Sequence, residues 1–255
     1  AAADDHAQKA VLVTGASSGI GLKITERLAA EGHFVYAGAR KAADIERLSA
    51  MDNVMGIRLD VTSQEEIDAA VALVRKEGRG LWGIINNAGV YAGGMMLEMS
   101  EDDLQFQLEV NVFGPYRVNK AFADLILESG GRFNVISSIS GTLSGPGFGA
   151  YSMSKHAMEA YSDSLAREME RFGVKVSVVE PGNYQSKIGQ TLKKRMDAKR
   201  IHIEGSPYEK EMQRMLDRLA SGEPQKDPAS RPPPSSIRPL RSTSIAVPGV
   251  TERCE

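Results

Sequence analysis

The sequence predicts an α/β protein in which one doubly wound parallel sheet forms a single domain. Six short runs rich in valine and isoleucine alternate with longer segments whose apolar residues recur at helical spacing. Most of the runs are nearly continuous, as in strands that are buried on both faces. The chain of 255 residues is long enough to bury the core of such a domain. Ligands of these sheets bind at the carboxyl ends of the strands, so the residues just after each run are the first candidates for a site.

The six predicted strands are taken in chain order. They are AVLVTG (10–15), HFVYAGA (33–39), NVMGIRLDV (53–61), LWGIINNAG (81–89), RFNVISS (132–138) and VKVSVVEPG (174–182). The first connecting helix is indicated by Ile20, Ile24 and Leu28, and a later one by Ile67, Val71 and Val74.

Beyond the sixth run the chain changes character twice. Segment 190–222 shows no strand, and an apolar stripe at helical spacing predicts a helix there, formed by Tyr208, Met212, Met215, Leu216 and Leu219. That helix either packs on the body of the domain or covers an apolar substrate pocket, and both can hold. Segment 223–255 is dense in proline, serine and arginine, and no helix can run through RPPP. We expect irregular structure or disorder in this tail.

Composition excludes several classes of protein. The formal net charge of −2 and the sequence pI of about 6.2 argue against a nucleic-acid partner. A single cysteine, Cys254, excludes a disulfide framework and a cysteine-built metal site within the chain, and the four histidines show no ligand spacing, so no metal is expected. No apolar run reaches the roughly 18 residues of a membrane span. These observations favour a soluble, cytoplasmic protein.

A glycine-rich stretch, TGASSGIG (14–21), follows the first strand and opens the first helix. Gly15 allows a sharp turn, Gly19 a close approach of backbone to a ligand, and Gly21 close packing of the helix. The amino end of that helix offers N–H groups and a positive dipole to a phosphate. The stretch therefore predicts a dinucleotide site, with Gly15, Ser17, Ser18, Gly19, Ile20 and Gly21 as its contacts.

The residue after the second strand bears on which dinucleotide is bound. A carboxylate there would hold a ribose 2′-hydroxyl, but the strand ends in Ala39, Arg40 and Lys41. A guanidinium pairs well with a phosphate, so Arg40 favours NADP(H), with NAD(H) possible. The alternative is that Arg40 is an ordinary surface charge.

Four further residues are candidates for a functional site, although a tyrosine and a lysine at helical spacing are, taken alone, mostly a solvated pair. Tyr151 and Lys155, in AYSMSKHA, are four residues apart and share one face of a helix. Ser138 stands at the carboxyl end of the fifth strand, and Asn111 lies within a long helical segment. With NNAG (86–89) and the Pro-Gly pair at 181–182, over roughly residues 9 to 190, this set resembles the classical short-chain dehydrogenase/reductase family, whose fold is Rossmann-like. The stretches NVFGPYRV and EPGNY are similar to relatives that act on steroids or retinoids.

The resemblance implies a role for each residue. Tyr151 would be the general acid/base, and Lys155 would favour its tyrosinate form and hold the nicotinamide ribose. Ser138 would donate a hydrogen bond to the substrate oxygen, and Asn111 would link Lys155 to solvent through a water. Ser137 is the less suitable hydroxyl, since its side chain should point to the other side of the strand. The remaining cofactor contacts would be Asp60, Val61, Asn86, Ala88, Gly89, Pro181 and Gly182.

The family pattern fails in the tail, where a further helix and a last core strand usually follow. We therefore expect a sheet without a regular last strand, and one explanation is that the tail was translated from a shifted reading frame. The expected layout is a disordered lead-in at 1–9, the dinucleotide-binding and catalytic domain at 10–189, a substrate loop and helix region at 190–222, and the atypical tail at 223–255.

The leading hypothesis is an NADP(H)-dependent oxidoreductase that interconverts a secondary alcohol and a ketone or aldehyde. Met95, Met96, Leu97 and Met99 favour a lipophilic substrate, although core packing explains them equally well. A homo-oligomer is possible. The alternative is a nucleotide-binding regulator or scaffold without turnover, and an epimerase or dehydratase with tightly held cofactor is less favoured.

Overall fold

The computed structural model describes residues 8–182, 188–199, 203–220 and 237–239. In these residues six parallel strands form one sheet in the order β3-β2-β1-β4-β5-β6. The strands are β1 (Ala10–Val13), β2 (Phe34–Ala39), β3 (Val54–Arg58), β4 (Gly83–Asn86), β5 (Arg132–Ile136) and β6 (Lys175–Val179). Each lies within one of the six predicted runs, so the doubly wound parallel sheet is confirmed. Strand order reverses between β1 and β4, which opens a crevice at their carboxyl ends.

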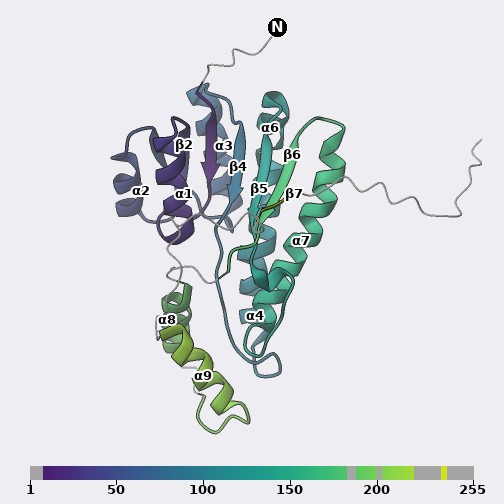
Figure 1. Cartoon of the computed structure of the whole chain (residues 1–255). Helices are drawn as coiled ribbons and strands as arrows, with labels where there is room; N and C mark the ends of the chain where they lie inside the picture. The colour runs from purple at the N-terminus through teal and green to yellow at the C-terminus, as the bar shows by residue number, and fades with distance from the viewer. Residues whose placement is uncertain (1–7, 183–187, 200–202, 221–236, 240–255) are drawn as a thin grey trace, which may run out of the picture.

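Helices cover both faces of the sheet (Figure 1). Successive strand residues point to opposite faces, so Leu12 packs with one set of helices and Val11 and Val13 with the other. The Leu12 face is covered by α3 (Gln64–Glu77), α5 (Gly114–Ala121), α6 (Ala123–Ser129) and α7 (Gly149–Glu170), and the opposite face by α1 (Gly19–Ala30) and α2 (Ala42–Ser49).

Local signals fix where some of these helices begin and end. The Ser63 hydroxyl accepts a hydrogen bond from the backbone N–H of Glu66, 3.3 Å away, and so caps the start of α3. Gly78 ends the same helix with φ +67°, a left-handed conformation that glycine adopts without strain.

The sequence predicts that Asn111 lies within one long helical segment. The structure shows that this segment is not one regular helix. A π-helical turn, Glu109–Phe113, separates α4 (Glu101–Leu108) from α5. Such turns insert an extra residue into a helix and are frequent at functional sites. Asn111 lies in the middle of this turn and is buried.

The chain beyond β6 departs from the core. Helices α8 (Ile188–Lys199) and α9 (Glu209–Ala220) contact each other and extend beyond the carboxyl ends of the strands (Figure 1). The helix predicted from the stripe at 208–219 is thus present as α9.

The tail contributes one short strand, β7 (Ile237–Pro239), which pairs antiparallel with β6. The backbone therefore departs from the expected irregular structure at these three residues. A proline suits such a place, because an edge strand does not need every N–H for its ladder. Residues 223–236 and 240–255, the rest of the predicted tail, lie outside the described residues.

The expected lead-in at 1–9 is described only at its last two residues, which belong to the fold. The Gln8 amide donates to the Gly32 carbonyl oxygen at 3.0 Å, and the Lys9 ammonium lies 4.6 Å from the centre of the Trp82 ring.

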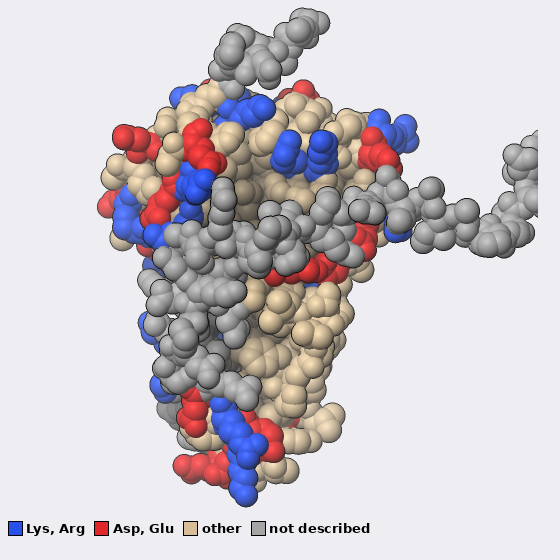
Figure 2. Space-filling view, in the orientation of Figure 1, with Lys and Arg blue, Asp and Glu red and all other residues tan. Residues whose placement is uncertain are grey.

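Charges of both signs lie close together on the upper half of the face in Figure 2, and the lower right, over α4 and α7, is largely free of them. No helix among the described residues is long and apolar enough to span a bilayer. The same residues contain no cluster of three or more His, Cys, Asp or Glu side chains suited to a metal.

Candidate active site

A cavity of about 620 Å³ lies at the carboxyl ends of the strands, where the strand order reverses. The loops after β1, β2, β4, β5 and β6 all reach it. The structure brings most of the predicted site residues to its wall: Gly15, Ser17, Ser18, Gly19, Ile20, Arg40, Asp60, Val61, Ala88, Gly89, Ser138, Tyr151, Lys155, Pro181 and Gly182.

The glycine turn forms one end of this cavity. Gly15 and Gly19 adopt φ values of +65° and +57°, so both need the conformational freedom of glycine. A Cβ at Gly21 would lie 2.4 Å from the Gly15 carbonyl oxygen. Gly21 is therefore not at the cavity wall itself, but its missing side chain lets α1 pack against the turn.

Asn86, predicted as a cofactor contact, is turned away from the cavity. Its side chain is buried and donates to Asn119 Oδ1 at 2.8 Å. The next residue, Asn87, lines the cavity instead, and its amide donates to the carbonyl oxygens of Thr14 (2.9 Å) and Gly15 (3.1 Å). Successive side chains of a strand point to opposite faces, so only one of the two asparagines at the end of β4 can face the cavity. This alternation could have been applied to the sequence.

Arg40 and Asp60 stand at the cavity end near β2 and β3. Arg40 Nη1 lies 3.7 Å from Asp60 Oδ2, and the Arg40 side chain is 64% exposed. Burial would raise the pKa of Asp60, but hydrogen bonds from Thr62 and the charges of Arg40 and Arg58 together lower it below its ordinary value. Asp60 is thus anionic at neutral pH.

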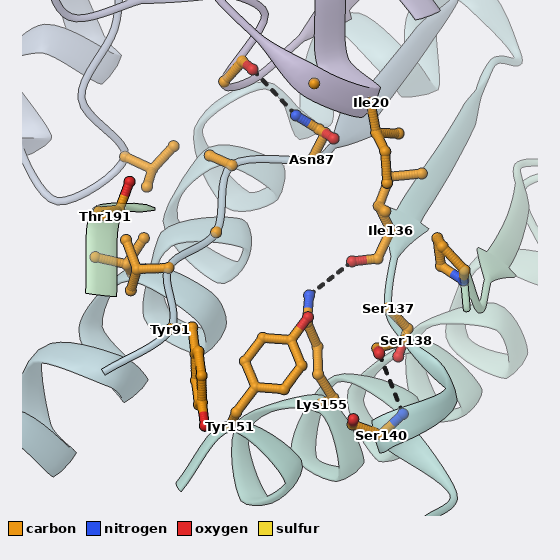
Figure 3. A pocket seen from close by; sticks show the side chains of 18 of the residues that line it. Ile20, Asn87, Tyr91, Ile136, Ser137, Ser138, Ser140, Tyr151, Lys155 and Thr191 are labelled. Carbon is orange, nitrogen blue, oxygen red and sulfur yellow. Dashed lines mark hydrogen bonds between the residues drawn. The ribbon is translucent and has the colours of Figure 1, made fainter. Parts of the chain in front are cut away.

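Tyr151 lies in the first turn of α7 and lines the cavity (Figure 3). Burial raises the pKa of its hydroxyl, and a hydrogen bond with Ser138 acts in the opposite direction. Burial has the larger effect, so the pKa of Tyr151 lies above its ordinary value. Ser138 Oγ also accepts a hydrogen bond from the Ser140 N–H at 3.1 Å, which fixes its position.

Lys155 is buried behind Tyr151, on the same face of α7. Its Nζ donates to the Ile136 carbonyl oxygen at 2.8 Å and lies 5.5 Å from the centre of the Tyr151 ring. Burial lowers the pKa of Lys155 to about 8, although the charge of Glu159 raises it. A small change in surroundings therefore decides whether Lys155 is charged near neutral pH.

Asn111 does not line the cavity, but it braces the loop that does. Its Oδ1 accepts from the Val90 N–H at 2.8 Å, and its Nδ2 donates to the Val90 carbonyl oxygen at 3.0 Å and to Ser154 Oγ at 3.1 Å. The amide thus joins the loop after β4 to α7. Its predicted water-mediated link to Lys155 stays a prediction.

Sequence reasoning missed the aromatic wall of the cavity. Tyr91 stacks on Phe148 with ring centres 5.0 Å apart and meets Tyr151 edge to face at 5.5 Å. Burial raises the pKa of Tyr91, and Tyr151 raises it further, so Tyr91 stays protonated. Its hydroxyl donates to the Gly147 carbonyl oxygen at 2.8 Å. Its position directly after NNAG-Val was the signal that could have identified it. Thr191, on α8, was also missed, and it too lines the cavity.

Helix α8 reaches the cavity wall through Thr191, and α9 packs against α8. An apolar cluster joins them to the wall and contains Tyr91, Met95, Leu192, Met196, Met212 and Met215, with Phe148 and Tyr151 packed against it. Arg195 of α8 donates through Nε (2.9 Å) and Nη2 (2.6 Å) to Asp103 of α4. The methionine stripe therefore packs on the body of the domain, and its role as the cover of an apolar substrate pocket stays a prediction.

The cavity fits a dinucleotide. A Cβ at Gly15 would meet Ala88 Cα at 2.9 Å, so the turn and the loop after β4 close around the space in front of α1. The amino end of α1 suits a pyrophosphate, and Asp60 and Val61, predicted to flank the adenine, line the cavity. Near the other end, Tyr151, Lys155 and Ser138 stand beside Pro181 and Gly182 in the wall.

Residues 9–197 match the short chain dehydrogenase family. The chain is 37% identical over 200 residues to the uncharacterized oxidoreductase YbbO of Escherichia coli, covering 78% of this chain and 74% of the relative. It is 39% identical to the mitochondrial D-beta-hydroxybutyrate dehydrogenase of Bos taurus (72% and 56%). It is 37% identical to the human 17-beta-hydroxysteroid dehydrogenase type 6 (70% and 57%). The match thus spans little more than half the length of the last two.

A solved structure gives the same result. A short chain dehydrogenase/reductase from Burkholderia phymatum in complex with NAD superposes with a TM-score of 0.76 at 26% identity, covering 87% of this chain and 82% of that one. Because the sequence match covers most of this chain and the site geometry agrees with it, the protein belongs to the short chain dehydrogenase family and is an NAD(P)-dependent oxidoreductase.

Proposed function

We propose that this oxidoreductase uses NADP(H) to interconvert a secondary alcohol and a ketone or aldehyde on a lipophilic small molecule, with Tyr151 as general acid/base. The observation that carries the proposal is the position of Tyr151. It stands where the dinucleotide cavity meets the apolar cluster of α8 and α9, with Ser138 and Lys155 beside it. A substrate that enters from the apolar side would bring its oxygen to these three groups.

The nicotinamide cofactor supplies or accepts the hydride. The chain's residues move the proton and hold the oxygen. In the reductive direction the Tyr151 hydroxyl donates its proton to the substrate oxygen as negative charge builds there, and Ser138 donates a hydrogen bond to the same oxygen. In the oxidative direction the tyrosinate removes the proton. A charged Lys155 stabilises the tyrosinate in both directions.

The apolar side supports a lipophilic substrate. Four methionines of the apolar cluster pack with the aromatic residues Tyr91, Phe148 and Tyr151 that line the cavity, and methionine side chains adapt to bulky apolar ligands. The hydroxysteroid dehydrogenase among the relatives favours the same substrate class, whereas the hydroxybutyrate dehydrogenase favours a small hydroxy acid. A ketone panel that contains both classes distinguishes them, since the proposal requires higher kcat/KM for the bulky apolar compounds.

The preference for NADP(H) rests on Arg40. We expect Arg40→Ala to weaken NADPH binding about tenfold and NADH binding by less than twofold, because only NADPH carries the 2′-phosphate. Nicotinamide fluorescence titration measures both dissociation constants. Arg27→Ala, which removes an exposed guanidinium that bonds to Glu31 in the last turn of α1 and does not line the cavity, is the control. An equal loss for both cofactors at Arg40→Ala would show that Arg40 does not read the phosphate.

The first experiment is a titration of the purified protein with NADPH and NADH, followed by the ketone panel. Tight binding with turnover supports the proposal. Tight binding without turnover on any compound would instead support the regulator or scaffold. A cytoplasmic location and a homo-oligomer belong to the same proposal, and size-exclusion chromatography with light scattering tests the second.

A further inference from the structure

Glu159 lies on α7 one turn beyond Lys155, and its carboxylate is shut off from solvent. Residues four apart share one face of a helix, so both side chains leave α7 on the side of the cavity and β5. Both carboxylate oxygens of Glu159 are buried. A glutamate side chain is seldom fully buried unless it is paired with another group.

The turn after β5 packs against the Glu159 carboxylate at Gly141. A Cβ at Gly141 would lie 2.9 Å from Glu159 Oε1 and 2.9 Å from Ser137 Oγ. The absence of a side chain at Gly141 therefore makes room for both groups at one place. Ser137, the hydroxyl that the sequence analysis set aside for catalysis, has a buried Oγ without a hydrogen-bond partner among the described protein atoms.

The surroundings of Lys155 contain few charges. On its own helix the ring of Tyr151 lies 5.5 Å from Nζ and the charge of Glu159 acts on it, while α7 also carries the titratable residues His156, Tyr161, Asp163, Arg167, Glu168 and Glu170. From β5 it meets the Ile136 carbonyl oxygen, and from the loop after β4 it meets Gly89, where a Cβ would lie 4.0 Å from Nζ. Of these groups, Glu159 is the one whose charge raises the pKa of Lys155 against the effect of burial.

We propose that Glu159 is a positioning residue that keeps the Lys155 ammonium charged while Tyr151 exchanges its proton, an inference that rests on the proposed function for its catalytic consequence. Glu159 does not reach the cavity wall. It acts through Lys155. A charged Lys155 favours the tyrosinate form of Tyr151, so Glu159 influences the ionisation of Tyr151 indirectly.

The direction of the effect follows from the charges. Loss of the carboxylate removes the influence that raises the pKa of Lys155, so this pKa falls below about 8. Lys155 would then lose its charge at lower pH. Tyrosinate would be less stabilised, and the loss would be largest between the wild-type and the lowered titration midpoints of Lys155.

The test is an NMR titration of lysine side chains, labelled with ¹³C at Cε, in the protein without cofactor. The Lys155 signal is assigned by its loss in Lys155→Arg. We expect Glu159→Gln to lower the titration midpoint of Lys155 by roughly one pH unit, as for the loss of a nearby opposite charge. Glu159→Asp, which keeps a charge but draws it back, should lower the midpoint by less.

The control is Glu170→Gln, which removes an exposed glutamate at the far end of α7 and should leave the midpoint unchanged. A midpoint in Glu159→Gln equal to that of wild type overturns the proposal. Should Glu159→Gln fail to fold, Glu159→Asp decides, and an unchanged midpoint there overturns it as well.

The pH profile of alcohol oxidation gives a second readout. In Glu159→Gln, kcat should fall roughly tenfold at pH 8 and recover at high pH, where the tyrosine ionises without help. A uniform loss at every pH would show a structural role only. The NMR result does not depend on turnover, so a failure of the proposed function leaves the coupling between Glu159 and Lys155 separately measurable.

Discussion

Tyr151→Phe should lower kcat by roughly a thousandfold, within the range for the loss of a general acid/base, and leave the NADPH dissociation constant nearly unchanged. The substitution keeps the ring that meets Tyr91 edge to face at 5.5 Å, so the aromatic wall stays in place. It removes only the hydroxyl that bonds with Ser138 and that we propose exchanges the proton. Steady-state kinetics on the best ketone and a fluorescence titration with NADPH measure the two effects.

A matched control for this variant is Tyr161→Phe on the same helix. The Tyr161 hydroxyl accepts a hydrogen bond from Asn119 Nδ2 at 3.1 Å and packs away from the cavity, near Val135 and Met158. Its loss should change kcat by no more than a few-fold. If Tyr151→Phe retained activity comparable with Tyr161→Phe, Tyr151 would not be the acid/base.

Gly21→Ala should destabilise the fold by about 3 kcal/mol and weaken NADPH binding at least tenfold. The new Cβ would lie 2.3 Å from Asn87 Nδ2 and 2.4 Å from the Gly15 carbonyl oxygen. The first contact is with a side chain, but the second is with backbone, which cannot yield without moving the glycine turn. Because Asn87 donates to that same carbonyl oxygen, the turn and the loop after β4 would be displaced together.

Urea unfolding measures the loss of stability, and Gly83→Ala provides the control. A Cβ at Gly83, in the interior strand β4, would meet its nearest neighbours at 3.6 to 3.8 Å, an ordinary contact distance. Its effect should stay below about 1 kcal/mol. Equal stability of the two variants would mean that α1 can shift to accommodate the methyl group.

The strands of the sheet could be predicted because their signal is local. Continuous apolar runs and the turns after them mark all six parallel strands, and the glycine turn marks the first crossover. The π-helical turn at Glu109–Phe113 could not be predicted, since its cause lies elsewhere. Asn111 bonds both backbone groups of Val90, 21 residues away, and no helical period encodes that contact.

The site divides in the same way. Residues that follow strands directly, such as Ser138 and Arg40, could be placed at the cavity from sequence alone. The pairing of Tyr91 with Phe148 and the cover from Met215 depend on how distant segments pack, and composition shows only that such residues exist. Asn86, Gly21 and Asn111 lie outside the cavity wall, and at the end of β4 the alternation of side chains places Asn87 there instead of Asn86.

The Asn111 brace also bears on the order in which the molecule assembles. It joins residues 21 positions apart, whereas the contact of Asn87 with Thr14 joins residues 73 positions apart. Closing the longer loop costs about 1 kcal/mol more in chain entropy. We therefore expect the loop after β4 to take its native shape on the nascent α4–α5 segment first, and the glycine turn to dock onto it afterwards. Dinucleotide added during refolding would then accelerate only the last kinetic phase, since its binding site is completed by that docking.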